Sequence, residues 1–186
     1  MDKFSIQNIQ KISSLTSELE LEKASSLFMQ LRVHEKEDES YKPIRNHLRK
    51  LIKDYEKKNW VDEDKITDSQ IKESDLAEAL IQAETEFYYQ RKELIKTKLK
   101  EVGLNQNDLA KILGHRKGYM SELINGLRPF SKEDIVVINR LFKIKLEDLI
   151  PTFIKQERAV HIKKTLETLS SNKIRLTKKD FDLQMA

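Results

Sequence analysis

The closely spaced helix signals between residues 104 and 150 constrain the fold of this chain more than any other feature. Asn105 has a side chain suited to capping a helix N-terminus, and it predicts a helix over residues 106–113. Gly114 ends that helix, because glycine adopts the left-handed conformation of a helix C-terminus at little cost. A second helix is expected over residues 117–125. The two helices are thus joined by a short glycine turn.

Two further helical segments follow. Asn125 and Gly126 stop the second helix, and Ser131 caps a third, with Asp134 at the position where a capping box usually has glutamate. A last helical turn holds Leu146, Leu149 and Ile150. The apolar positions at helical spacing are expected to form one core: Leu109, Ala110, Leu113, Met120, Leu123, Ile135, Ile138, Leu141 and Phe142. The stretch therefore predicts four short helices around a small core.

Composition places the chain among helix-rich cytosolic proteins. Of its 186 residues, 35% are charged, while only 4 are glycine and 3 are proline. The absence of cysteine excludes disulfides, thiol catalysis and cysteine-ligated zinc, and it fits a reducing compartment. No apolar run approaches the roughly eighteen residues of a membrane span, and the N-terminus lacks the features of a signal peptide. We therefore expect a cytoplasmic protein without a membrane segment.

Charge is distributed unevenly along the chain. Residues 1–93 carry 16 Lys/Arg against 20 Asp/Glu, a net charge of −4. Residues 94–150 carry 11 against 7, and residues 151–186 carry 8 against 4, so each of these segments is +4. A basic C-terminal half favours a polyanionic partner, although a solvated helix surface with surplus lysine gives the same charge. The acidic N-terminal part would repel phosphate and suits a basic protein partner instead.

The N-terminal part is expected to be helical. Apolar spacing predicts one or two helices over residues 5–33 and another over residues 41–58. The second of these segments carries an apolar stripe that either packs within the region or meets a partner: Ile44, Leu48, Leu51, Ile52 and Tyr55.

Two more helices complete an all-α fold. One is expected from residue 71 to about 102, capped by Ser69 or Asp68, with a break near residues 83–87 because a helix of this length is uncommon. The other is expected over residues 154–169.

The segment between residues 104 and 150 resembles the Cro/repressor-like helix-turn-helix family. The resemblance rests on the joint spacing, without a gap, of Gln106, Leu109-Ala110, Leu113-Gly114, Met120, Asn125-Gly126, Ser131, Leu146 and Leu149. It implies a five-helix domain that binds double-stranded DNA. A single small domain of this kind buries too little DNA for tight binding, so we expect a homodimer on a palindromic operator.

The resemblance also divides the chain into three regions. Residues 1–70 would form a helical N-terminal region, and residues 71–153 the helix-turn-helix domain with its leading helix. Residues 154–186 would form a C-terminal helix and tail.

The family's DNA contacts carry over position by position. The second helix of the motif enters the major groove with its N-terminus first. Arg116, Lys117 and Gly118 would then lie nearest the base edges, with Glu122 one turn deeper. The positions that match phosphate contacts are Gln106, Tyr119, Asn125 and Arg128.

Three positions depart from the family pattern. Arg116 replaces the usual Ser or Thr cap, and Gly118 lies in a helix interior, so each weakens the helix by roughly 1 kcal/mol unless DNA contact compensates. Ile124 is apolar where the family usually has a polar residue. This suggests cover by the C-terminal extension or a second subunit, although exposed apolar residues are also common.

A narrower resemblance is to the Hig-type (host inhibition of growth) antitoxins of the same family. It rests on Leu123, Gly126, Arg128 and Ser131, and more loosely on the helix over residues 41–58. It implies repression of the protein's own operon and neutralisation of a basic ribonuclease toxin.

The sequence therefore predicts a DNA-binding transcriptional repressor, most specifically an antitoxin. The alternatives are a phage-type or stand-alone repressor without a toxin, and an interaction module with vestigial DNA binding. No nucleophile elbow, phosphate-binding glycine loop or His-Glu-x-x-His pattern is present, so we expect no catalysis, no metal and no cofactor.

Overall fold

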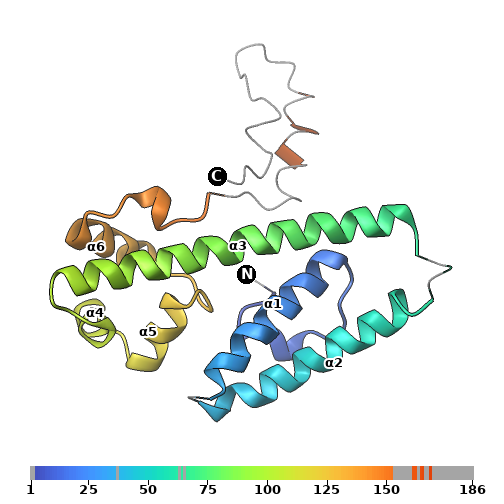
Figure 1. The fold of residues 1–186 in the computed structure, drawn as a ribbon, viewed down its shortest axis with the longest axis horizontal. Coiled ribbons are helices and arrows are strands. Elements are labelled where there is room, and N and C mark those ends of the chain that lie inside the picture. Colours follow the sequence, from blue (N-terminus) through green and yellow to red (C-terminus); the bar gives the residue numbers. More distant parts are fainter. Residues whose placement is uncertain are drawn as a thin grey trace. The chain divides into compact units, whose positions relative to one another are not determined.

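The computed structural model describes residues 3–36, 38–62, 64, 66–152, 161, 162, 164, 165 and 168. All regular secondary structure in these residues is helical (Figure 1), which confirms the predicted all-α class. The chain divides into two compact units, Met1–Leu149 and Ile150–Ala186. The predicted helix over residues 154–169 lies mostly outside the described residues.

The first unit begins with the helices of an N-terminal bundle. These are η1 (Ile9–Lys11), α1 (Glu18–His34), η2 (Glu39–Tyr41) and α2 (Lys42–Asn59). Of the one or two helices predicted over residues 5–33, the structure has two, η1 and α1, separated by residues 12–17, and helix begins at residue 9 rather than at residue 5. The hydroxyl of Ser17 accepts a hydrogen bond from the Glu20 amide at 3.3 Å and so caps α1 where the chain leaves its extended conformation.

The helix α2 packs its predicted apolar stripe inside the bundle. Leu48 and Leu51 are buried in the bundle core, and Ile44, Ile52 and Tyr55 pack against it. The internal-packing alternative is therefore confirmed. The remaining core residues come from four segments of the first unit: Ile6, Ile9, Ile12, Leu15, Leu21, Ala24, Leu27, Leu31, Tyr41 and Leu127.

The helix α3 (Asp68–Glu101) runs without interruption for 34 residues, so the predicted break near residues 83–87 was wrong. Its first half packs against α1 of the bundle, and its second half packs against α4 and α6, so two successive sets of contacts support one helix. Thr67 caps it, accepting from the Gln70 amide at 3.2 Å, in place of the predicted Ser69 or Asp68.

The helix-turn-helix region comprises α4 (Gln106–Leu113), α5 (Lys117–Ile124), α6 (Lys132–Phe142) and η4 (Leu146–Asp148). The predicted caps are confirmed: Asn105 and Ser131 each form a capping box, and Gly114 ends α4 in the left-handed conformation. The buried core combines these helices with the second half of α3: Ile95, Leu99, Leu109, Ala110, Met120, Leu123, Ile124, Phe130, Ile135, Ile138, Phe142, Ile144 and Leu149.

Two apolar residues of this region differ from expectation. Leu141 was expected to face the core but is 50% exposed. Ile124, by contrast, is only 1% exposed and belongs to the same core as Ile95 and Leu99 of α3. Ile124 is therefore buried in the core of the helix-turn-helix region itself, where cover by the C-terminal extension or a second subunit was expected.

No helix in the described part of the chain combines the length and apolar character that a membrane span requires.

Candidate nucleic-acid interface

The exposed start of α5 is the centre of the candidate interface. Arg116 is the N-cap residue and its side chain makes no capping hydrogen bond. Arg116, Lys117 and Gly118 are all exposed, and no atom lies near the place where a β-carbon on Gly118 would stand. The first turn of this helix therefore exposes two cationic side chains and one position that has no side chain.

The turn before α5 is held against α6 by a side-chain contact. His115 Nε2 lies 2.9 Å from Asp134 Oδ1. The other carboxylate oxygen of Asp134 accepts from the Ser131 amide at 3.1 Å, as part of the capping box of α6. The His115 ring also lies edge-on to the ring of Tyr119, with 5.1 Å between centroids. The His115–Asp134 pair, which sequence reasoning missed, thus ties the turn to the next helix.

The four predicted phosphate-contacting residues lie in different surroundings. Gln106 is half-buried at the first position of α4. The Asn125 side chain is turned back, donating to the Ser121 carbonyl at 2.8 Å. Tyr119 is 40% exposed, and the Arg128 guanidinium lies over its ring at 5.5 Å from the centroid. Tyr119 and Arg128 therefore form one cluster beside α5, whereas Gln106 lies at the N-terminus of α4.

Glu122 belongs to an internal network. Its carboxylate accepts a hydrogen bond from the Tyr41 hydroxyl at 2.6 Å and forms an ion pair with Arg128. The Glu122 side chain is only 12% exposed. Burial and the Glu122 carboxylate together raise the pKa of Tyr41, which keeps its hydroxyl protonated as a donor. A base contact by Glu122, which the family resemblance implies, would have to replace these two partners.

Arg91 of α3 fixes the far end of α5. The guanidinium donates to the Leu123 carbonyl at 3.2 Å and to the Leu149 carbonyl at 3.4 Å. It also lies 4.8 Å from the ring centroid of Tyr88 and 4.9 Å from that of Phe130. Burial lowers the pKa of Arg91 to about 10, so the group stays charged at neutral pH. No sequence pattern indicated this role of Arg91, because its hydrogen-bond partners lie 32 and 58 residues further along the chain.

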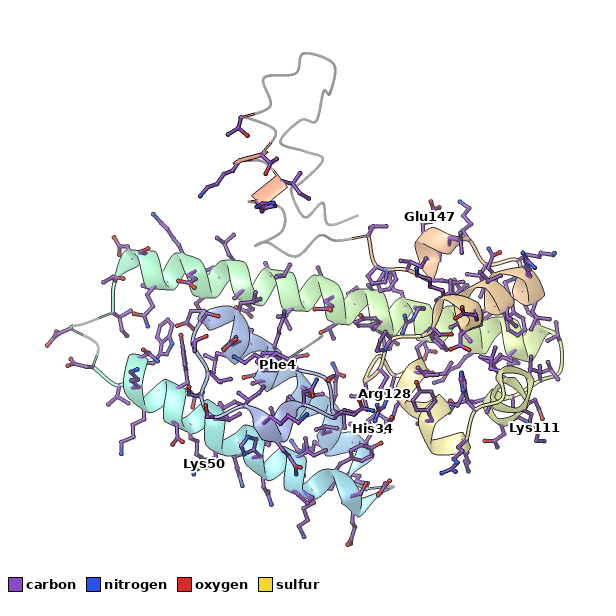
Figure 2. All side chains as sticks on the ribbon, turned by 180° about the vertical axis from the view of Figure 1, so that it is seen from behind. Phe4, His34, Lys50, Lys111, Arg128 and Glu147 are labelled. Atoms are coloured by element: carbon purple, nitrogen blue, oxygen red, sulfur yellow. The ribbon has the colours of Figure 1, made fainter. Side chains whose placement is uncertain are left out.

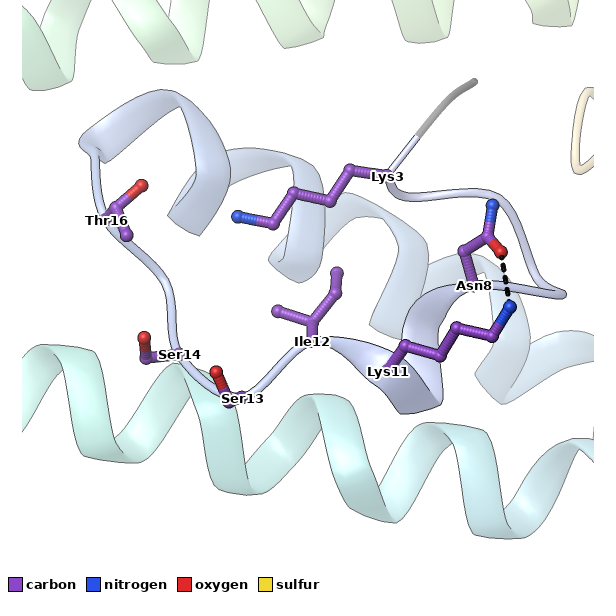
Figure 3. A pocket seen from close by; sticks show the side chains of 7 residues that line it. All are labelled: Lys3, Asn8, Lys11, Ile12, Ser13, Ser14 and Thr16. Atoms are coloured by element: carbon purple, nitrogen blue, oxygen red, sulfur yellow. Dashed lines mark hydrogen bonds between the residues drawn. The ribbon is translucent and has the colours of Figure 1, made fainter.

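The hollow shown in Figure 3 is separate from this interface. It is lined by one N-terminal segment of the bundle: Lys3, Asn8, Lys11, Ile12, Ser13, Ser14 and Thr16. Lys11 Nζ donates to Asn8 Oδ1 there at 3.3 Å. None of the predicted DNA-contacting residues lines it.

Comparison with known proteins agrees with the geometry of this region. Residues 95–149 match the family model described as Helix-turn-helix (HTH_3). The chain therefore carries a helix-turn-helix domain of the Cro/C1 type, a domain of DNA-binding regulators. No curated protein and no solved structure matches the chain.

Proposed function

We propose that this protein is a sequence-specific transcriptional repressor that reads duplex DNA with the first turn of α5. The observation that carries the proposal is the exposed pair Arg116 and Lys117, presented at the N-terminus of α5 within a matched helix-turn-helix domain. Arg and Lys side chains at this position suit guanine O6 and N7 in the major groove. The open backbone at Gly118 permits close approach to a base edge.

The direct test is titration of the purified protein with a duplex that covers the region upstream of its own gene. A duplex of random sequence and equal length serves as the control. We expect binding to the upstream duplex at least about a thousandfold tighter than to the random one. Equal affinity for both duplexes would favour the alternative of an interaction module whose DNA-binding domain is vestigial.

The proposal includes a homodimer on a palindromic site. One domain of this size buries too little DNA surface for tight binding, so two copies should bind half-sites about one helical turn apart. Because Ile124 is buried, it is not available for the dimer contact. Leu141 of α6, by contrast, is exposed. Sedimentation of the full chain, free and on DNA, tests this; a monomer in both states would contradict it.

A more specific proposal is that the repressor is an antitoxin. It is supported by Leu123, Gly126, Arg128 and Ser131 at the spacing of Hig-type antitoxins. It is tested by inducing the neighbouring genes in cells with and without this protein. We expect one product to stop growth and this protein to restore it. If no neighbouring product is toxic, the antitoxin role fails and the plain repressor stands.

A further inference from the structure

Positive charge within the N-terminal region is concentrated on one helix. Helix α2 carries 7 Lys/Arg and 2 Asp/Glu, a net charge of +5. Residues 1–93 as a whole are −4 (16 basic against 20 acidic), so the rest of that region is −9. The net charge of the whole region therefore conceals the strongly basic helix α2.

The basic residues of α2 share one side of the helix. With about 100° between successive residues, five of them and Asn46 fall within an arc of about 100°. They are Lys42, Arg49, Lys50, Lys53 and Lys57, all exposed. Leu48 and Leu51 lie on the opposite, buried side. We call this exposed arc the α2 basic face.

The two acidic residues of α2 do not neutralise this face. Asp54 and Glu56 lie at the two edges of the arc. Within the part of the chain that the structure describes, Lys50, Lys53 and Lys57 form no ion pair. Three cations are therefore available to an anionic partner.

Some of the acidic residues just before α2 already bind other groups of the protein. Glu35 forms an ion pair with Arg45, and the Asp38 carboxylate accepts from the Ser40 amide at 2.9 Å. Glu39 is exposed. The available positive charge thus lies in the middle and at the end of α2.

The α2 basic face lies beside the helix that reads DNA. Tyr41, the N-cap residue of α2, donates to Glu122 of α5, so α2 starts against α5. From there its 18 residues extend for about 27 Å, which is about the length of eight base pairs along the DNA axis. Figure 1 shows α2 and α5 on the same side of α3, and Figure 2 shows Lys50 on the outside of α2.

The acidic half of α3 lies on the side of α1 that is opposite to α2. Helix α1 packs against both α2 and α3 and lies between them (Figure 1). Residues 68–93 of α3 carry 7 Asp/Glu against 3 Lys/Arg, a net charge of −4. The basic helix α2 and the acidic half of α3 therefore lie on opposite sides of α1, and α2 begins against α5.

We infer that the α2 basic face is a second DNA-binding surface, which binds the phosphate backbone of the duplex beside the site read by α5. The inference rests on the proposed function. It assigns to α2 a sequence-independent role, because lysines on phosphates contribute affinity and salt dependence and carry no base preference.

The test compares two triple variants of the full chain. One carries Lys50→Gln, Lys53→Gln and Lys57→Gln. The matched control carries Lys11→Gln, Lys23→Gln and Lys72→Gln, which removes the same charge from the bundle outside α2. Affinity is measured across a range of salt concentrations for a duplex limited to the site bound by wild type, and for one extended by about ten base pairs on each side.

On the extended duplex, the α2 variant should bind at least about tenfold more weakly, and its slope of log affinity against log salt should be shallower by about two to three units. The control variant should match wild type. Asn46→Lys, which adds a cation within the arc, should steepen the slope by about one unit.

An α2 variant that matches wild type, or matches the control, overturns the inference. So does an Asn46→Lys variant with an unchanged slope. Failure of the proposed function looks different, because wild type itself would then show no preference for any duplex sequence.

Discussion

Two glycines near α5 face different steric conditions. Gly126 has φ +77°, and a β-carbon there would stand 2.9 Å from Tyr88 Cγ. Gly118 lies within α5, and nothing lies near its added β-carbon. The first glycine is required by the packing of α3 against the turn, whereas no packing within the protein requires the second, which lowers the stability of the helix.

We predict opposite effects of alanine at these positions. Gly126→Ala should lower the free energy of unfolding by about 1–3 kcal/mol, through left-handed strain and the contact with Tyr88. Gly118→Ala should raise it by about 0.5–1 kcal/mol, since alanine favours a helix interior. Urea unfolding without DNA measures both. Destabilisation by Gly118→Ala equal to that of Gly126→Ala would contradict the stated packing.

A second residue-scale prediction separates base reading from positioning. Lys117→Ala should cost roughly 1–3 kcal/mol of binding on the specific duplex and relax base preference there. Gln106→Ala should weaken binding to specific and random duplexes alike, because a phosphate contact carries no sequence information. Competition titrations against both duplexes give the two ratios. Equal losses on both duplexes for Lys117→Ala would remove its base-reading role.

The capping residues were predictable from sequence because the determining contacts are local. Asn105 and Ser131 bond to amides within three residues of themselves. The partners of Glu122 and Arg91 are different, because Tyr41 precedes Glu122 by 81 residues and Leu149 follows Arg91 by 58. Contacts between such distant positions leave no periodic signal in one sequence.

At the scale of elements, α3 organises the helix-turn-helix core. Sequence periodicity identified this helix, and its unusual length suggested an interruption. A single sequence does not show that the bundle and then α4 with α6 support successive halves. Local patterns likewise could not show that Ile124 belongs to the same buried core as Ile95 and Leu99 of α3. Arg91 links α3 to the last turn of α5 and to the residue after η4 through two carbonyls.

We predict that Arg91→Ala lowers the free energy of unfolding by about 2–4 kcal/mol. The change removes the buried aliphatic part of the arginine side chain and leaves the Leu149 carbonyl without this hydrogen-bond donor. These two losses exceed the free energy gained because a cation is no longer buried. Arg91→Lys should cost less, since it keeps the stem and the charge. Chemical unfolding followed by circular dichroism measures both. A change below about 0.5 kcal/mol for Arg91→Ala would contradict this role.

At the scale of the first unit, the bundle and the helix-turn-helix region share both a helix and a side-chain network. Leu127, which follows α5, is buried in the bundle core, and Tyr41 of the bundle bonds to Glu122 of α5. The charge of residues 1–93 suggested from sequence that this part would repel DNA. That average missed the basic side of α2, because a net charge summed over 93 residues does not resolve the charge of a single helix.

We predict that Glu122 acts through this network. Glu122→Gln should reduce stability by about 1–3 kcal/mol, as a charge-assisted contact to Arg128 is lost, and should leave base preference unchanged. Tyr41→Phe should reduce stability by about 1 kcal/mol. Binding to duplexes substituted at each position separates the roles. Relaxed preference at a single base pair in Glu122→Gln would instead support the base-reading role carried over from the family.

Whether α5 reads a particular DNA sequence is tested most directly by selecting duplexes from a random pool with the full chain and with Lys117→Ala in parallel. Wild type should enrich one palindromic motif with half-sites about one helical turn apart, bound at least about a thousandfold more tightly than the starting pool. Lys117→Ala should enrich a motif that is degenerate at one position in each half-site. A wild-type selection that yields no motif, or the same motif from both proteins at equal affinity, would contradict the claim.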